Sequence, residues 1–89
     1  MKPTKVLTYR VIIKKDDSDY HGFVPLLPGC HTSGKTIEET RKNLREVITL
    51  HLQVMRDEKM DIPHESGLEM IETFDASSVF GNNLPMIYV

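Results

Sequence analysis

Cysteine, net charge and long apolar runs are all scarce in this 89-residue chain, and each shortage excludes a class of protein. The single cysteine, Cys30, rules out an internal disulfide framework. A net charge of −2 leaves no basic footprint for nucleic acid. No apolar run is long enough to span a bilayer, and residues 1–10 carry charge where a signal peptide has its apolar segment. We therefore expect a cytoplasmic protein that binds neither membrane nor DNA directly.

The remaining composition is that of an ordinary globular domain. Hydrophobic residues make up 39% of the chain and charged residues 27%. At this length we expect residues 1–89 to form one domain. Such a small domain buries only a modest core, so self-association would add to its stability.

The N-terminal third predicts a hairpin followed by a short third strand. Apolar and polar residues alternate over 6–14, as in a strand with one buried and one solvated face. The polar run 15–19 is expected to be a turn, and 20–26 a second strand. Residues 30–33 are predicted to form a third strand, which Gly34 ends.

One long helix is predicted over 36–57, where the hydrophobic period changes to that of a helix. Thr36 and Glu39 form a capping box at its start. Leu50 and Val54 widen the apolar arc beyond what one sheet face needs, which indicates a partner surface. The main stripe consists of Ile37, Thr40, Leu44, Val47, Ile48, His51 and Met55.

Two further strands are predicted after the helix. A linker over 61–67 contains a proline, and 68–74 alternates again. Residues 75–83 are rich in turn formers, and the apolar run 84–88 reads as a final strand, laid on this sheet or on that of a neighbouring copy. These patterns predict an α+β fold with a short C-terminal strand.

Apolar residues near the end of the chain indicate self-association. Met86, Ile87 and Tyr88 would be unusual as a free, solvated terminus. An isologous pair would bury them together with Leu50 and Val54. We therefore expect a homodimer or a tetramer with an interface at these five residues.

Gly29–Thr36 satisfies the G-x-x-x-x-G-K-[ST] pattern of a phosphate-binding loop. A nucleotide-binding protein also needs an acidic residue at the end of a second apolar strand to hold the metal, and residues 71–75 are a poor substitute. The loop would also follow a hairpin strand rather than a strand of a parallel sheet. Nucleotide binding at Gly29–Thr36 is therefore kept only as an alternative, and no cofactor is expected.

The four histidines show no metal-ligand spacing. Cys30 beside His31 is the best candidate pair for a metal, but we prefer to interpret the two residues as a small buried thiol and a loop histidine. No acidic or nucleophilic residues assemble into a recognisable active site. We expect no catalytic residues, no metal site and no enzymatic activity.

The turn and the helix start resemble the HicB antitoxin family. Residues 24–34 read VPLLPGCHTSG and residues 36–39 read TIEE, close to the family's V-P-D-L-P-G-C turn and its T-x-E-E helix start. Residues 50–52 and 62–63 are similar to its helix end and the linker that follows. The similarity covers about residues 7–74. Leu26 and Lys35 depart from the family, which usually has aspartate at both places.

This resemblance implies a fold like a partial ribonuclease H domain, without ribonuclease activity. Three antiparallel strands would carry one crossover helix, with a fourth strand beside the first. HicB proteins neutralise HicA, a small toxin that cleaves messenger RNA, by covering its RNA-facing surface.

A HicA-like toxin is therefore the expected partner. Leu26, Leu27, Pro28 and His31 are the expected contact residues. Full-length family members add a C-terminal DNA-binding module, and this chain is expected to lack one. The alternative is a solitary oligomeric HicB-like domain with an unrelated partner.

Overall fold

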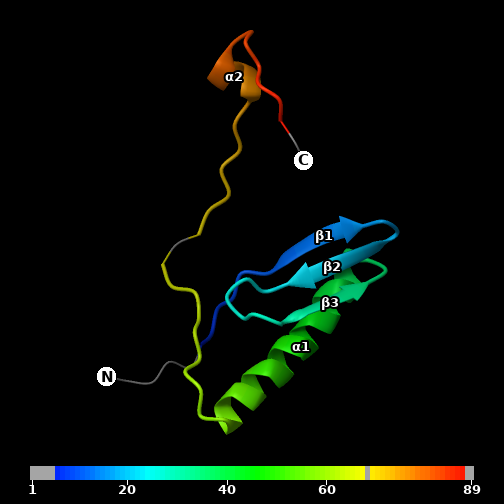
Figure 1. Cartoon of the computed structure of the whole chain (residues 1–89), viewed down its shortest axis with the longest axis vertical. Helices are drawn as coiled ribbons and strands as arrows, with labels where there is room; N and C mark the ends of the chain where they lie inside the picture. Colours follow the sequence, from blue (N-terminus) through cyan, green and yellow to red (C-terminus); the bar gives the residue numbers. More distant parts are fainter. Residues whose placement is uncertain (1–5, 68, 88–89) are drawn as a thin grey trace.

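The computed structural model describes residues 6–67 and 69–87, which contain three strands and two helices (Figure 1). The elements follow in the order β1 (Ile12–Asp16), β2 (Asp19–Phe23), β3 (His31–Gly34), α1 (Ile37–Asp57) and α2 (Ala76–Phe80). The antiparallel three-stranded sheet and the long helix confirm the predicted α+β class.

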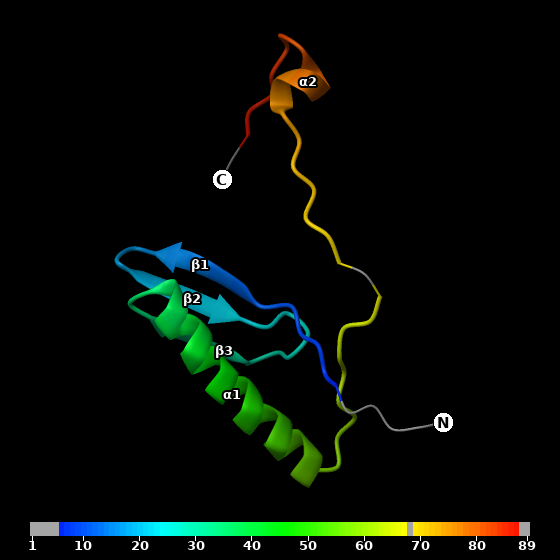
Figure 2. The same cartoon turned by 180° about the vertical axis from the view of Figure 1, so that it is seen from behind.

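The sheet has the order β1-β2-β3, and both strand pairs are antiparallel. α1 lies across one face of this sheet, as the two opposite views show (Figures 1 and 2). Its contacts are mainly with β3 and β2, so the helix leaves β1 partly uncovered. β1 is also an edge strand, and its outer edge has no ladder partner among the described residues.

α1 begins where the sequence provides a complete cap. The hydroxyl of Thr36 accepts a hydrogen bond from the Glu39 amide at 3.0 Å. The Glu39 carboxylate in turn accepts a hydrogen bond from the Lys35 amide at 3.3 Å. The first bond satisfies an amide that a helix start leaves without an intrahelical partner, and the second holds the residue before the cap.

A small core joins the turn after β2 to α1. Val24, Leu27 and Cys30 from the turn are buried together with Leu44 from the helix. Five partly buried residues pack around this group: Tyr9, Val47, Ile48, Leu52 and Met55. The helix approaches the sheet closely, because a Cβ atom on Gly34 would lie 2.8 Å from the Thr40 amide nitrogen. Gly34 is therefore required for space.

β1 starts later than the alternation predicts, at Ile12 rather than at residue 6. β2 ends at Phe23, and the chain then turns through Pro25, so residues 6–11 have no strand to pair with on that side. They lie instead beside the linker after α1. The Glu65 amide donates a hydrogen bond to the Thr8 carbonyl at 2.8 Å.

Neither strand predicted after the helix forms within the described part of the single chain. Residues 69–75 and 84–87 have no ladder partner, and the short helix α2 lies in the stretch predicted as turns. The physical reason is that this part of the chain runs away from the sheet, and a strand requires a neighbour (Figure 1). Leu68 and Tyr88 lie outside the described residues.

Among the residues that the structure describes, no helix combines the length and the apolar character needed to cross a membrane.

Candidate functional site

The face of the sheet opposite α1 carries a cluster of aromatic and imidazole side chains. A Cβ atom on Gly22 would touch Thr40 of α1, so the neighbouring His21 and Phe23 point to the other face. The strand register places Phe23 opposite His31. The ring centroids of His21 and His31 lie 5.5 Å apart, and those of His21 and Phe23 lie 6.2 Å apart.

The turn 24–30 continues this face at one end of the sheet. Three backbone hydrogen bonds close it: Val24 to Cys30, Leu27 to Val24, and Cys30 to Leu27. Gly29 adopts a φ of 84°, a conformation that side chains disfavour. A hollow of about 380 Å³ lies between the turn and the cluster formed by His21, Phe23 and His31. The result is a hydrogen-bonded turn beside a hollow in the surface.

The structure divides the four contact residues expected from the sequence into two groups. Pro28 and His31 are exposed and Leu26 is half-buried, so all three lie at the surface. Leu27 is only 1% exposed and belongs to the core, where it holds the turn in shape. A partner can therefore contact three of the four directly.

Sequence reasoning missed His21 and Phe23, which the structure adds to this surface. The signal was present, because the two residues flank Gly22 in the run Tyr20-His21-Gly22-Phe23. Strand alternation places residues two apart on the same face. The sequence does not indicate which face of the sheet α1 covers.

An acidic tip lies at the far end of the hairpin. Asp16, Asp17 and Asp19 cluster at the turn between β1 and β2. Lys35 donates a hydrogen bond from its ammonium to the Asp19 carboxylate at 2.8 Å. This hydrogen bond and the charge of Asp19 raise the pKa of Lys35 above its ordinary value. Asp16 and Asp17 form no ion pair within the described residues.

The geometry of Gly29–Thr36 does not support the nucleotide-binding alternative. His31–Gly34 is an extended strand of the sheet rather than a loop that curls around a phosphate. The hydroxyl of Thr36 is engaged as the helix cap, and the ammonium of Lys35 is held by Asp19. The motif match arises from a strand followed by a capped helix.

Cys30 is buried, and the loss of solvent raises the pKa of its thiol. A raised pKa leaves the thiol protonated at neutral pH and therefore weakly nucleophilic. Within the described residues, no three or more histidine, cysteine or acidic side chains come together to hold a metal ion.

The described residues among those expected at a dimer interface are exposed but lie in two separate places. Leu50 of α1 is 63% exposed and Met86 near the C-terminus is 79% exposed. Val54, one helical turn after Leu50, and Ile87, which follows Met86, are also exposed, and Tyr88 lies outside the described residues. One copy of the chain does not bring the two groups together.

Comparisons with known proteins agree on one family. The sequence pattern described as HicB-like antitoxin of bacterial toxin-antitoxin systems matches residues 9–83. A UPF0150 protein of Synechocystis sp. is 38% identical over 71% of this chain and 81% of its own length.

Two solved structures resemble the fold. The N-terminal domain of the Burkholderia pseudomallei antitoxin HicB is 34% identical, with a TM-score of 0.57 over 65% of this chain and 69% of that one. A HicA3–HicB3 toxin-antitoxin complex contains a chain that is 23% identical, with a TM-score of 0.53 over 83% of this chain and 78% of that one. The second likeness concerns the fold alone.

Proposed function

The chain belongs to the HicB-like antitoxin family of bacterial toxin-antitoxin systems, and from this premise we propose that it binds and neutralises a small HicA-type toxin that cleaves messenger RNA. The contact surface is the outer face of the sheet around His21, Phe23 and His31, continued by Leu26 and Pro28 on the turn. The observation that carries this proposal is the uncovered cluster of aromatic and imidazole rings on that face.

This face differs from an ordinary solvated sheet surface. A sheet covered on one side usually presents polar residues on the other. On this face, Ile12 of β1, Phe23 of β2 and His31 of β3 lie opposite one another across the three strands. Aromatic side chains are enriched at the centres of protein interfaces, where a few residues supply most of the binding energy. The closed turn keeps Leu26 and Pro28 in place, which lowers the entropy cost of binding.

Asp16 and Asp17 at the hairpin tip offer carboxylates to a basic partner, next to the exposed Lys14 and Lys15 of β1. Asp16 and Asp17 are exposed at one end of the binding face. A toxin that binds RNA needs a basic surface, and carboxylates beside the contact face would accelerate its approach. Inhibition of this kind requires only that the toxin's RNA-facing surface be covered, so the antitoxin needs no chemistry of its own.

The experiment is co-expression with a small basic protein encoded next to this gene. We expect growth to be rescued and a complex to elute from a sizing column. The double variant Phe23→Ala/His31→Ala should weaken binding by about 30-fold or more, as for the loss of central interface residues. The matched control is Glu46→Ala, which changes an exposed residue of α1 away from this face.

The folding of each variant is checked by thermal melting before binding is measured. Unchanged binding by the folded double variant would contradict the proposed surface. Persisting toxicity with no complex, for the wild-type chain, would contradict toxin neutralisation and favour an oligomeric domain with an unrelated partner.

A further inference from the structure

Residues 69–87 form an arm that stands away from the rest of the molecule (Figures 1 and 2). Its helix α2 contacts none of the other helices and strands that the structure describes. The radius of gyration is 17.6 Å, against about 12 Å for a compact chain of this length. A single copy therefore leaves the arm without a packing partner.

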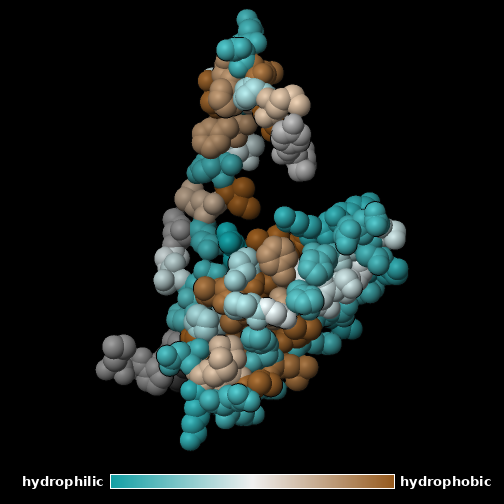
Figure 3. Space-filling model, in the orientation of Figure 1, coloured by the Kyte–Doolittle hydropathy of each residue, from teal (hydrophilic) through white to brown (hydrophobic). Residues whose placement is uncertain are grey.

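The arm is too apolar to be a solvated extension. Ile71 is 96% exposed, and apolar side chains gather on the arm in the space-filling view (Figure 3). Its other exposed large apolar residues are Met70, Phe74, Val79, Phe80, Leu84, Met86 and Ile87. Exposed apolar surface of this extent marks an interaction site.

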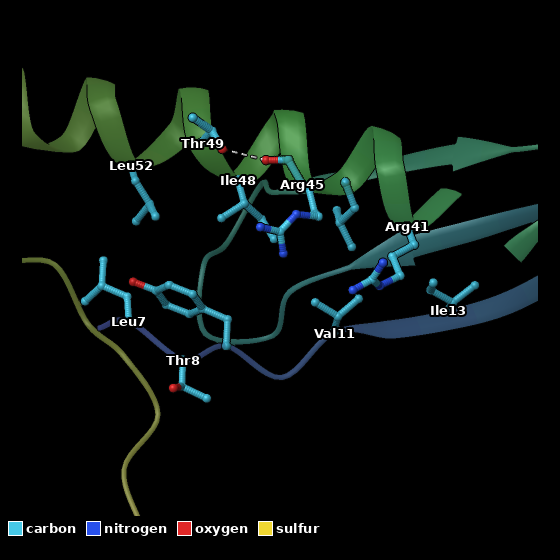
Figure 4. Close-up of a pocket in the computed structure, with 11 residues that line it drawn as sticks. Leu7, Thr8, Val11, Ile13, Arg41, Arg45, Ile48, Thr49 and Leu52 are labelled. Atoms are coloured by element: carbon cyan, nitrogen blue, oxygen red, sulfur yellow. Dashed lines mark hydrogen bonds between the residues drawn. The ribbon is translucent and has the colours of Figure 1, made fainter. Parts of the chain in front are cut away.

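The body carries an uncovered apolar groove between α1 and residues 7–13 (Figure 4). Its volume is about 620 Å³. Leu7, Val11 and Ile13 line one wall, and Ile48 and Leu52 of α1 line the other. The groove exists because α1 packs mainly on β2 and β3 and leaves the β1 side open.

The groove and the arm are complementary in charge. Arg41 and Arg45 extend from α1 over the groove (Figure 4), and neither has an acidic partner within the described residues. The arm carries Glu69, Glu72 and Asp75 and has no lysine, arginine or histidine. Opposite charges at the rim of an apolar contact set its orientation and favour the correct partner.

A second, shallower hollow extends the groove along α1. Its volume is about 460 Å³, and it shares Arg45 and Thr49 with the groove. Leu50 lies in its lining. The far end of the arm, at Met86 and Ile87, provides the apolar side chains to cover it.

We propose that the arm docks into the groove of a second copy of this chain, and that the exchange is reciprocal. The linker is fastened beside one end of the groove, because Tyr9 donates a hydrogen bond to the Pro63 carbonyl and Glu65 donates one to Thr8. From there the arm leads away from its own body (Figures 1 and 2). The chain would therefore have to reverse its direction sharply to dock the arm into the groove of the same copy. A two-fold pair satisfies both arms with identical contacts and needs no reversal. The inference does not depend on toxin binding.

The open edge of β1 gives the exchanged arm a second point of attachment. Residues 69–75 are non-helical, and β1 is the edge strand beside the groove. An extended segment from another copy can add to such an edge through main-chain hydrogen bonds. The fourth strand expected beside the first is thus supplied by the partner copy.

The test is complementation between two defective variants. Val11→Glu places a negative charge in the groove, where it repels the acidic arm. Ile71→Glu damages the arm at a fully exposed position. Light scattering should give the wild-type chain twice its mass of 10.2 kDa. Each variant alone should raise the dimer dissociation constant at least tenfold. Mixing the two should restore a dimer, because one intact arm then meets one intact groove.

The matched control is Ile37→Glu, which changes an exposed apolar residue of α1 outside the groove and should remain dimeric. Circular dichroism establishes that each variant is folded. A monomeric wild-type chain, dimers that persist in both variants, or a mixture of folded variants that stays monomeric would each overturn the proposal. The last result would indicate that the arm docks on its own body.

Discussion

At the scale of single residues, Tyr9 connects three parts of the molecule. Its ring packs against the core and lines the groove, and its hydroxyl donates a hydrogen bond to Pro63 in the linker. Partial burial raises the pKa of Tyr9 above its ordinary value of 10.0, so the hydroxyl stays protonated and able to donate. Tyr9 therefore helps, with the backbone bond between Glu65 and Thr8, to hold the linker that leads to the arm.

Replacing Tyr9 with phenylalanine tests this role. Tyr9→Phe keeps the ring and removes the hydrogen bond, so we expect a loss of about 0.5–1.5 kcal/mol in the free energy of unfolding. Hydrogen exchange at the Glu65 amide should accelerate, because that amide bonds to Thr8 in the same linker contact. Unchanged exchange at Glu65 would show that the linker is held by other contacts.

The same residue predicts a pH dependence. Because the folded pKa of Tyr9 is raised, the folded state binds this proton more tightly than the unfolded state. The contribution to stability is fully present below the unfolded value of 10.0 and is lost as pH rises beyond it. The wild-type chain should therefore lose stability above about pH 10 more steeply than Tyr9→Phe does, in denaturant titrations.

At the scale of the elements, sequence reasoning succeeded where local signals and packing agree. The change of period at Thr36 and the capping box both mark the start of α1, and the structure contains both cap hydrogen bonds. The hairpin followed from alternation. Sequence reasoning failed for residues 6–11, which were predicted to belong to the first strand. Their alternation indicates one buried face but contains no information on whether a neighbouring strand is present to pair with them.

The candidate binding face was also only partly predictable. The turn residues Leu26 and Pro28 and the β3 residue His31 were found through resemblance, and the structure places them at the surface. Leu27 was predicted to be a contact residue as well, although it lies in the core. The sequence of a turn does not indicate whether an apolar residue in it faces the core or the solvent. His21 and Phe23 required knowledge of the side that α1 covers.

The short helix α2 provides a prediction at this scale. The Asp75 carboxylate accepts hydrogen bonds from the Ser77 amide at 2.8 Å and the Ser78 amide at 3.3 Å, as a helix cap. Hydrogen bonds lower the pKa of Asp75 below its ordinary value of 3.8, and the bond with Ser77 has a larger effect than the bond with Ser78. The stabilising effect is therefore present above pH 3.8 and is lost as pH falls through the lowered pKa.

A carbon-detected NMR titration of the Asp75 carboxyl group should show this directly. We expect a midpoint below 3.8 in the wild-type chain and a midpoint closer to 3.8 in Ser77→Ala, which removes the hydroxyl. An exposed carboxylate without a cap role, Glu46, is the control within the same spectrum. An Asp75 midpoint at or above 3.8 would contradict the cap.

At the scale of the whole molecule, the body and the arm have opposite characters. Among the described residues, the four buried apolar ones all belong to the body, between Val24 and Leu44. The described part of the arm has no buried residue, although much of it is apolar. Folding of the body should therefore not depend on the arm, whereas assembly should.

Removing residues 69–89 separates these two contributions. We expect the shortened chain to keep its helical circular dichroism signal and its cooperative unfolding, since the core and the linker contacts at Thr8 and Tyr9 remain. It should be a monomer with a radius of gyration of about 11 Å by small-angle X-ray scattering. Binding to the toxin should persist, because the proposed face around Phe23 and His31 lies in the body. A shortened chain that unfolds would instead place the arm within its own core, and one that remains dimeric would move the subunit contact to the body itself.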